Sequence, residues 1–128
     1  MNETDLRNWL DRYRRAWETR DPEVAAALFS EDARYYETPF AEPARGRKGV
    51  RDYWENATRG QSDVAFSHNV VAVSGSRGIA RWSATFTRIA SGARVALDGI
   101  FLLEFDDEGL CRELREWWHS VGREPRDT

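Results

Sequence analysis

The sequence lacks the features that mark several large classes of protein. Cys111 is its single cysteine, which excludes an internal disulfide bond and a zinc site built from several cysteines. No apolar run approaches the roughly 20 residues that cross a bilayer, and the polar residues 1–5 are unlike a secretory signal. Basic residues do not exceed acidic ones, at 19 against 22, which argues against nucleic acid as a partner. We therefore expect a cytoplasmic protein with no nucleic-acid or membrane partner.

Aromatic side chains, by contrast, are abundant in these 128 residues, with six Trp, six Phe and four Tyr. The length supports a single domain, which we expect over residues 1–121, followed by a polar tail at 122–128. A chain of this size buries roughly two-thirds of its unfolded surface and can form a core without disulfide bonds. The aromatic residues therefore form either an unusually aromatic core or a cavity lined with flat apolar rings.

Three helices are predicted in the N-terminal half. Residues 4–20, with Thr4 as N-cap, carry apolar side chains at steps of three and four, which place them on one helical face. These side chains are Leu6, Trp9, Leu10, Tyr13 and Trp17. Asp21 and Pro22 then begin a short second helix that carries Val24, Leu28 and Phe29 on its apolar face. A third helix follows Gly46, presents Tyr53 and Trp54 on one face, and ends near Gly60.

The C-terminal half changes to a period of two, which is typical of strands. We expect strands at residues 63–73, 78–89, 93–105 and 110–119, after a first strand at 33–38. Their connections in the C-terminal half are short and contain glycine, so neighbouring strands run antiparallel. Helices grouped before an antiparallel sheet indicate the α+β class, with three helices covering one face of a curled sheet and a hollow between them.

The turns predict which residues face this hollow. Pairing the strands across their turns puts His68, Ala84, Gly99 and Glu116 in one row across the inner face. Two members of this row are among the smallest residues, so we expect open space between the two ionisable ones. The row depends on register, because a slip of one residue turns Glu116 outward. The register of the last hairpin is left open, because both a three-residue and a four-residue loop ending at Gly109 fit the sequence.

This arrangement predicts a site for proton transfer. A Glu116 carboxyl group among apolar residues loses hydration, which raises its pKa toward the range of a general base near neutral pH. His68 is assigned an assisting role, and Tyr13 on the helix can donate to a developing oxyanion. The side chains expected to contact the ligand include Trp17, Trp54, Phe66, Trp82, Phe86, Phe101 and Trp118. No metal-ligand set or nucleotide motif is visible, so no cofactor is predicted.

Short motifs are spread over about residues 5–119. They are Arg12-Tyr13, Ala16, Asp21, Ala27-Leu28-Phe29, Asp32-Ala33, Pro39, Gly46, Tyr53-Trp54, Gly99-Ile100-Phe101, Asp107-Glu108-Gly109 and Leu114-Arg115-Glu116-Trp117-Trp118. Their order resembles the nuclear transport factor 2-like superfamily, and within it the SnoaL-like polyketide cyclase type. The resemblance implies a cone-shaped α+β barrel around a deep pocket, and a homodimer formed through the open outer face of the sheet.

Individual members of that superfamily imply different sites. Similarity to ketosteroid isomerase matches Tyr13 to its helix tyrosine, but Thr38 stands at the base position and Phe101 at the second acid. Similarity to limonene epoxide hydrolase makes Glu116 the water-activating acid, although the segment Arg81-Trp82-Ser83 lacks the partner acid. The SnoaL-like cyclases imply one carboxylate base in an apolar pocket, with a histidine or tyrosine nearby.

The first strand leaves a choice of which residues face inward. Either Tyr35 and Glu37 or Tyr36 and Thr38 point into the pocket, because alternate residues of a strand share a face. The match of Thr38 to the isomerase base position favours Tyr36 as a further ligand contact.

Three hypotheses follow. The first is a cofactor-independent isomerase, cyclase or hydrolase acting on a small apolar substrate, with Glu116, His68 and Tyr13 as catalytic residues. The second is a domain that binds a small apolar ligand without chemistry. The third is a dimerisation module, whose outer sheet face has Ile100, Leu102 and Trp117 at its apolar centre.

Overall fold

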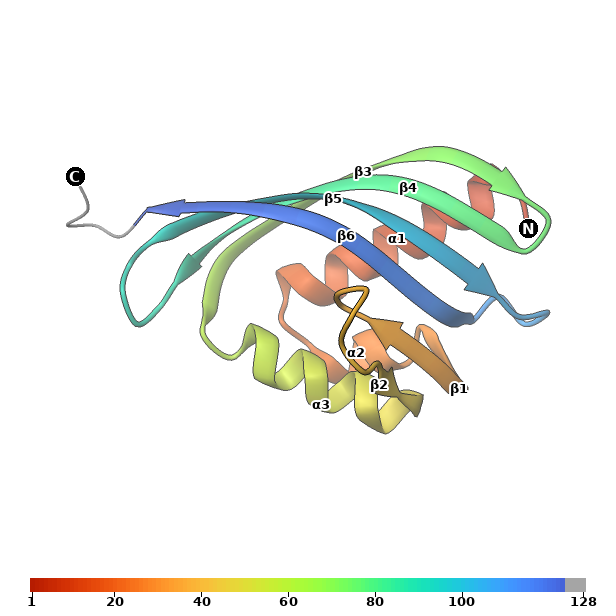
Figure 1. Cartoon of the computed structure of the whole chain (residues 1–128), viewed down its shortest axis with the longest axis horizontal. Coiled ribbons are helices and arrows are strands. Elements are labelled where there is room, and N and C mark those ends of the chain that lie inside the picture. Colours follow the sequence, from red (N-terminus) through yellow and green to blue (C-terminus); the bar gives the residue numbers. More distant parts are fainter. Residues whose placement is uncertain (124–128) are drawn as a thin grey trace.

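A computed structural model describes residues 1–123, which form one curved sheet with three helices on its concave side (Figure 1). The elements in chain order are α1 (Glu3–Glu18), α2 (Pro22–Ala26), β1 (Phe29–Tyr36), β2 (Ala44–Arg45), α3 (Gly46–Thr58), β3 (Gln61–Ser74), β4 (Arg77–Arg88), β5 (Arg94–Phe105) and β6 (Cys111–Arg123). The strand order is β2-β1-β6-β5-β4-β3. Only β1 and β6 pair in parallel among these strands. The predicted α+β class, with three helices on a curved and mainly antiparallel sheet, is confirmed.

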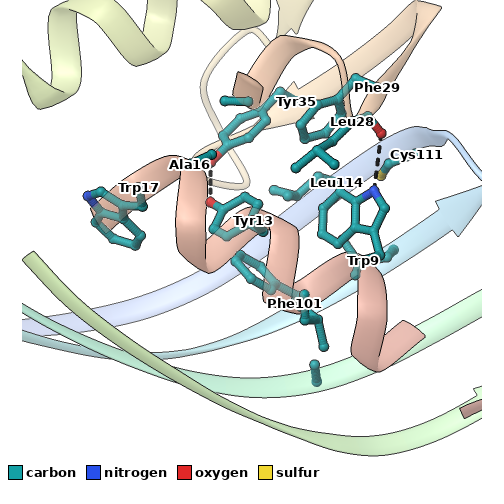
Figure 2. Packing of buried hydrophobic residues seen from close by; sticks show 14 of the residues in the cluster. Trp9, Tyr13, Ala16, Trp17, Leu28, Phe29, Tyr35, Phe101, Cys111 and Leu114 are labelled. Atoms are coloured by element: carbon teal, nitrogen blue, oxygen red, sulfur yellow. Dashed lines mark hydrogen bonds between the residues drawn. The ribbon is translucent and has the colours of Figure 1, made fainter. Parts of the chain in front are cut away.

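Helix α1 provides the aromatic face that packs against the sheet. Asn2, rather than Thr4, is its N-cap, and Asn2 and Asp5 form a reciprocal capping box. The buried side chains are those of the expected stripe, together with Ala16. Figure 2 shows Trp9, Tyr13 and Trp17 along this helix, with Phe101 and Leu114 of the sheet beside them. The backbone amide of Phe66 also donates to Glu18 at 3.0 Å, which fixes β3 to the helix.

Several element boundaries differ from the expected ones. Phe29 begins β1 and is fully buried there, instead of lying on α2, which already ends at Ala26. The two-residue strand β2 was not predicted, because two residues carry no detectable period. β6 continues to Arg123, two residues into the expected tail, and the rest of that tail lies outside the described residues. Within residues 1–123, no helix has the length and hydropathy that a membrane crossing needs.

The expected row of four residues across the sheet is wrong, because each antiparallel pairing is displaced by two residues. Glu116 lies opposite Phe101 rather than Gly99, and His68 lies opposite Trp82 rather than Ala84. A displacement of two preserves the faces of the strands. The predicted inner face therefore holds, while its predicted cross-strand neighbours do not.

The last hairpin reaches the correct face in an unexpected way. The backbone oxygen of Asp106 accepts a hydrogen bond from the Gly109 amide, and the Asp106 amide donates to the backbone oxygen of Leu110. These two bonds close a three-residue loop. Such a loop alone would turn Glu116 outward. The pairing then shifts between Phe105↔Cys111 and Glu104↔Glu113, so one extra residue, Arg112, forms a β-bulge. This bulge returns Glu116 to the concave face.

The space expected beside Gly99 is filled by an aromatic ring. A Cβ atom at Gly99 would lie 2.8 Å from Cζ2 of Trp82 and 2.7 Å from the backbone oxygen of Trp117. The glycine therefore makes room for the Trp82 indole, not for a ligand. This corrects the expectation that the small residues of the inner face leave it open.

We predict that Gly99→Ala destabilises the protein by about 1–3 kcal/mol, because overpacking forces the Trp82 ring or the β6 backbone to move. Gly60→Ala is the matched control, since nothing lies within 4 Å of a Cβ at that position. Urea unfolding of the two variants and the wild type measures both effects. Equal free energies of unfolding for the two variants would contradict this account of Gly99.

Candidate functional site

A cavity of about 280 Å³ lies between the helices and the concave face of the sheet. α1 and α3 form its roof, and β4, β5 and β6 form its floor. Its apolar walls are built from Trp17, Trp54, Ala57, Trp82, Phe86, Leu97 and Trp118. Its polar lining residues are Tyr13, Tyr35, Glu37, Tyr53, Thr58, Gln61, Arg88, Glu116 and Ser120.

Glu116 is the carboxyl group of the cavity floor, and it is only 5% exposed. Across residues 1–123, no cation forms an ion pair with it. Burial raises the pKa of Glu116 well above its ordinary value, and the nearby charge of Glu37 raises it further. A hydrogen bond with the Tyr35 hydroxyl lowers the pKa of Glu116, but this effect is smaller than that of burial.

Two tyrosine hydroxyls lie beside this carboxyl group. The hydroxyls of Tyr13 and Tyr35 are hydrogen bonded to each other at 2.9 Å, as Figure 2 shows. Burial, followed by the charge of Glu116, raises the pKa of both groups, so both are neutral phenols. Their mutual hydrogen bond uses one of their two protons. The other proton is available to Glu116 or to a ligand oxygen.

Glu37 adds a second carboxyl group to the lining. Its Oε2 accepts a hydrogen bond of 2.5 Å from the Tyr53 hydroxyl of α3. Its backbone oxygen accepts from Nε1 of Trp118 at 3.0 Å, which ties the end of β1 to β6. Burial is the main cause that raises the pKa of Tyr53, which therefore stays a hydrogen-bond donor. Glu37 is thus held by two neighbouring elements.

The mouth of the cavity carries Arg88 and Ser120, which are both exposed. The guanidinium carbon of Arg88 lies 5.6 Å from the centre of the Phe86 ring. Gln61, the cross-strand partner of Arg88, accepts a hydrogen bond of 2.8 Å from Nε1 of Trp17. The mouth is therefore polar, while the walls behind it are aromatic.

Two of the wall residues have unused hydrogen-bond donors. Nε1 of Trp54 and Nε1 of Trp82 are buried and find no partner within the described part of the chain. A buried donor without a partner costs about 1–3 kcal/mol. These two indoles are therefore polar groups of the cavity wall that the fold itself does not satisfy.

Seven of the expected site residues line the cavity, namely Glu116, Tyr13, Trp17, Trp54, Trp82, Phe86 and Trp118. Phe66 and Phe101 do not, because they stack on Trp82 within the core, with ring centres 5.9 and 5.2 Å from it. Tyr36 is wrong as a ligand contact. Its ring lies on the other face of β1, against the Arg115 guanidinium at 3.9 Å, while Tyr35 and Glu37 face inward.

His68 does not lie with the other expected catalytic residues. Its Nε2 is 2.9 Å from Oδ1 of Asp11 on α1, and it does not line the cavity. α1 packs along β3, and β3 is the edge strand three positions from β6, which carries Glu116. The sequence pattern gave the correct face for His68 but did not show where the helix crosses that face.

The sequence interpretation missed Tyr53, Gln61 and Arg88 as members of the site. Arg88 continues the alternation of Trp82 and Phe86 along β4, so the period of two was a usable signal for it. Gln61 and Tyr53 carried no such signal, since their positions depend on how α3 meets β3. No group of three His, Cys, Asp or Glu side chains within residues 1–123 is arranged to hold a metal ion.

Several solved structures share this architecture at low sequence identity. TsrD from Streptomyces laurentii aligns with a TM-score of 0.77 and 19% identity, over 92% of this chain and 90% of that one. The epoxide hydrolase/cyclase-like enzyme SalBIII, described for pyran ring formation in the polyether salinomycin, aligns at 0.79 and 19%, over 92% and 93%. The Δ5-3-ketosteroid isomerase from Mycobacterium sp. aligns at 0.79 and 16%, over 93% and 98%. At these identities the similarity establishes the fold alone.

No curated protein matches the sequence. The SnoaL-like domain family does match it, over residues 10–114, which is most of the chain. The expected resemblance to the nuclear transport factor 2-like superfamily is thereby confirmed, and the chain belongs to the SnoaL-like domain family.

Proposed function

We propose that the protein is a cofactor-independent isomerase, cyclase or hydrolase that acts on a small apolar molecule in this cavity. The observation that carries the proposal is the Glu116 carboxyl group, buried in the cavity floor without a cationic partner among the described residues. An unpaired buried carboxyl group is costly to the fold. Such groups, when they line a cavity, are candidates for a functional role.

Glu116 is the proposed general base. Its elevated pKa makes the ionised form a stronger proton acceptor than an ordinary carboxylate. In an isomerisation or cyclisation it takes a proton from the carbon next to a carbonyl group, and the electron pair moves to the carbonyl oxygen. In a hydrolysis it takes the proton from the attacking water molecule, whose oxygen bonds to the substrate carbon while the bond from that carbon to the leaving oxygen breaks. The proton then passes from Glu116 to the leaving oxygen.

Tyr13 and Tyr35 are the proposed oxyanion donors. Their pair has one proton that is not used between the two hydroxyls, and both are neutral. A phenol proton held among apolar walls stabilises an oxygen on which negative charge develops. Glu37 lies on the same wall and supports the high pKa of Glu116 through its charge. His68 has no part in this mechanism, because it is bonded to Asp11 away from the cavity.

We expect Glu116→Gln to lower kcat/KM by about 100-fold or more on any compound that the wild type converts. The assay is turnover of small apolar ketones, epoxides and polyketide-like compounds. The wild-type rate should rise with pH as Glu116 ionises, with a midpoint above the ordinary carboxyl range, and this limb should vanish in the variant.

Glu113→Gln is the matched control on the same strand. Glu113 is bonded to Arg34 and Arg115 and does not line the cavity, so its loss should leave turnover nearly unchanged. Full activity of Glu116→Gln would refute the proposed base. Tight binding of these compounds without any turnover would favour the second hypothesis, a binding domain.

We further propose that the chain forms a homodimer through the outer face of the sheet. Ile100 and Trp117 are cross-strand partners there, and they are 38% and 46% exposed. Arg81 and Asp98 form an exposed ion pair beside them at 3.2 Å. An apolar centre with charges of both signs around it suits a two-fold interface, in which each charge meets its opposite on the second copy.

For the homodimer, we expect a molar mass near twice that of one chain, and a return toward one chain in Trp117→Glu. Light scattering on a gel-filtration column across a range of concentrations measures this. Phe40→Glu is the control, because Phe40 is fully exposed in a loop away from the sheet. A single-chain mass for the wild type at all concentrations would contradict the homodimer.

A further inference from the structure

Arg88 is a cation at the cavity mouth that the proposed proton transfer does not use. It is the last residue of β4, on the same face of that strand as Trp82 and Phe86. Within the described residues, no carboxylate forms an ion pair with Arg88, although 12 such pairs occur elsewhere on the chain. Its guanidinium group therefore keeps its hydrogen-bond donors available at the mouth.

The two acidic residues of the cavity lie on the side away from Arg88. Glu116 is on β6, and Glu37 directly follows β1. The strand order β1-β6-β5-β4 puts three strand spacings between Glu37 and Arg88, and the register puts Arg88 eight residues beyond Ala80, the β4 residue level with Phe101 and Glu116. On a flat sheet these two offsets would separate the backbones by about 30 Å. The curvature of this sheet shortens that gap. The cavity is therefore acidic at one side and basic at the other.

The walls between these two sides are flat and apolar. Four indole rings, those of Trp17, Trp54, Trp82 and Trp118, line these walls together with the Phe86 ring. A volume of about 280 Å³ lies just below the roughly 300–1,000 Å³ of typical ligand pockets. The space suits a compact, planar molecule of one or two rings better than a large one.

We propose that the ligand is a small, planar, apolar molecule with a carboxylate at one end and a carbonyl or hydroxyl oxygen at the other. Its carboxylate pairs with Arg88 at the mouth, and its rings lie between the indoles. The second oxygen then lies toward Tyr13 and Tyr35, with the reacting atoms beside Glu116. This inference rests on the proposed function for the orientation of the ligand, and it narrows the substrate class to aromatic or cyclic keto- and hydroxy-carboxylates.

A guanidinium group can recognise a carboxylate with two parallel hydrogen bonds, which a neutral analogue of the same shape cannot form. The amide nitrogen of Gln61, the cross-strand partner of Arg88, lies at the same mouth and can add a donor to that carboxylate. The Oε1 atom of Gln61 already accepts from Trp17, so its amide nitrogen is the end left for a ligand.

The test compares two probes of nearly equal shape, 2-naphthoate and the neutral ketone 2-acetonaphthone. Binding is followed by quenching of tryptophan fluorescence, because four indoles line the cavity, and is repeated by calorimetry. We expect the wild type to bind 2-naphthoate at least tenfold more tightly than the ketone. Arg88→Gln should weaken 2-naphthoate at least tenfold, or about 1.4 kcal/mol, and leave the ketone unchanged.

Two further variants complete the test. Arg88→Lys should recover part of the affinity, because it keeps the charge but not the paired donors. Arg12→Gln, which removes an exposed arginine of α1 outside the cavity, should change neither probe. Unfolding curves confirm that each variant is folded.

Equal affinity of the wild type for the two probes, no binding of either, or an Arg88→Gln variant with unchanged affinity would each overturn this inference. None of these results depends on Glu116. Conversely, a selective Arg88 site combined with a fully active Glu116→Gln variant would leave the ligand class standing and refute the proposed base. The two failures are therefore distinguishable.

Discussion

The burial of Glu116 without a cationic partner among residues 1–123 is the constraint on which the site depends. A carboxyl group loses favourable hydration when it enters an apolar interior, and in most proteins an ion pair compensates for that loss. Here the neighbours are neutral phenols, indoles and a second carboxyl group, so the pKa of Glu116 rises. The distribution of charge in the cavity follows from this arrangement of neighbours. The acidic side of the cavity carries the proposed general base, and the basic side carries Arg88, which pairs with no carboxylate among residues 1–123 and is the proposed contact for an anion.

The aromatic composition of the chain serves two purposes in this fold. The rings of Trp9, Tyr13 and Trp17 on α1 fill the concave side of the sheet, and most of them pack against other rings. Between α3 and the C-terminal halves of β4 and β6, rings of the same kind line a cavity instead. Rigid rings hold the cavity open because they cannot fold into it as longer aliphatic chains can. The alternatives of an aromatic core and an aromatic cavity are therefore both realised.

Periodicity was sufficient to predict the fold class and the faces of the strands, but not the contacts across them. Glu116, Trp82 and Trp118 were placed on the inner face correctly, because faces depend only on alternation. The neighbours of Gly99 and His68 were wrong, because they depend on loop lengths that differ by one or two residues. No local sequence pattern marks the bulge at Arg112. The crossing of α1 over β3 depends on tertiary packing, which the periodicity of the sequence does not show. For the same reason, the choice between Tyr35 and Tyr36 required the parallel pairing of β1 with β6.

The measurement that tests the central claim most directly is the pKa of Glu116 in the folded protein. A carboxyl-carbon NMR titration, with the Glu116→Gln spectrum used for assignment, needs neither a substrate nor a partner. The structure predicts a midpoint well above the value of about 4.3 that is typical of an unperturbed glutamate, because burial and the charge of Glu37 both disfavour ionisation. A midpoint near that value would mean that the Glu116 carboxyl group is hydrated, and it would contradict both the buried site and the catalytic role built on it.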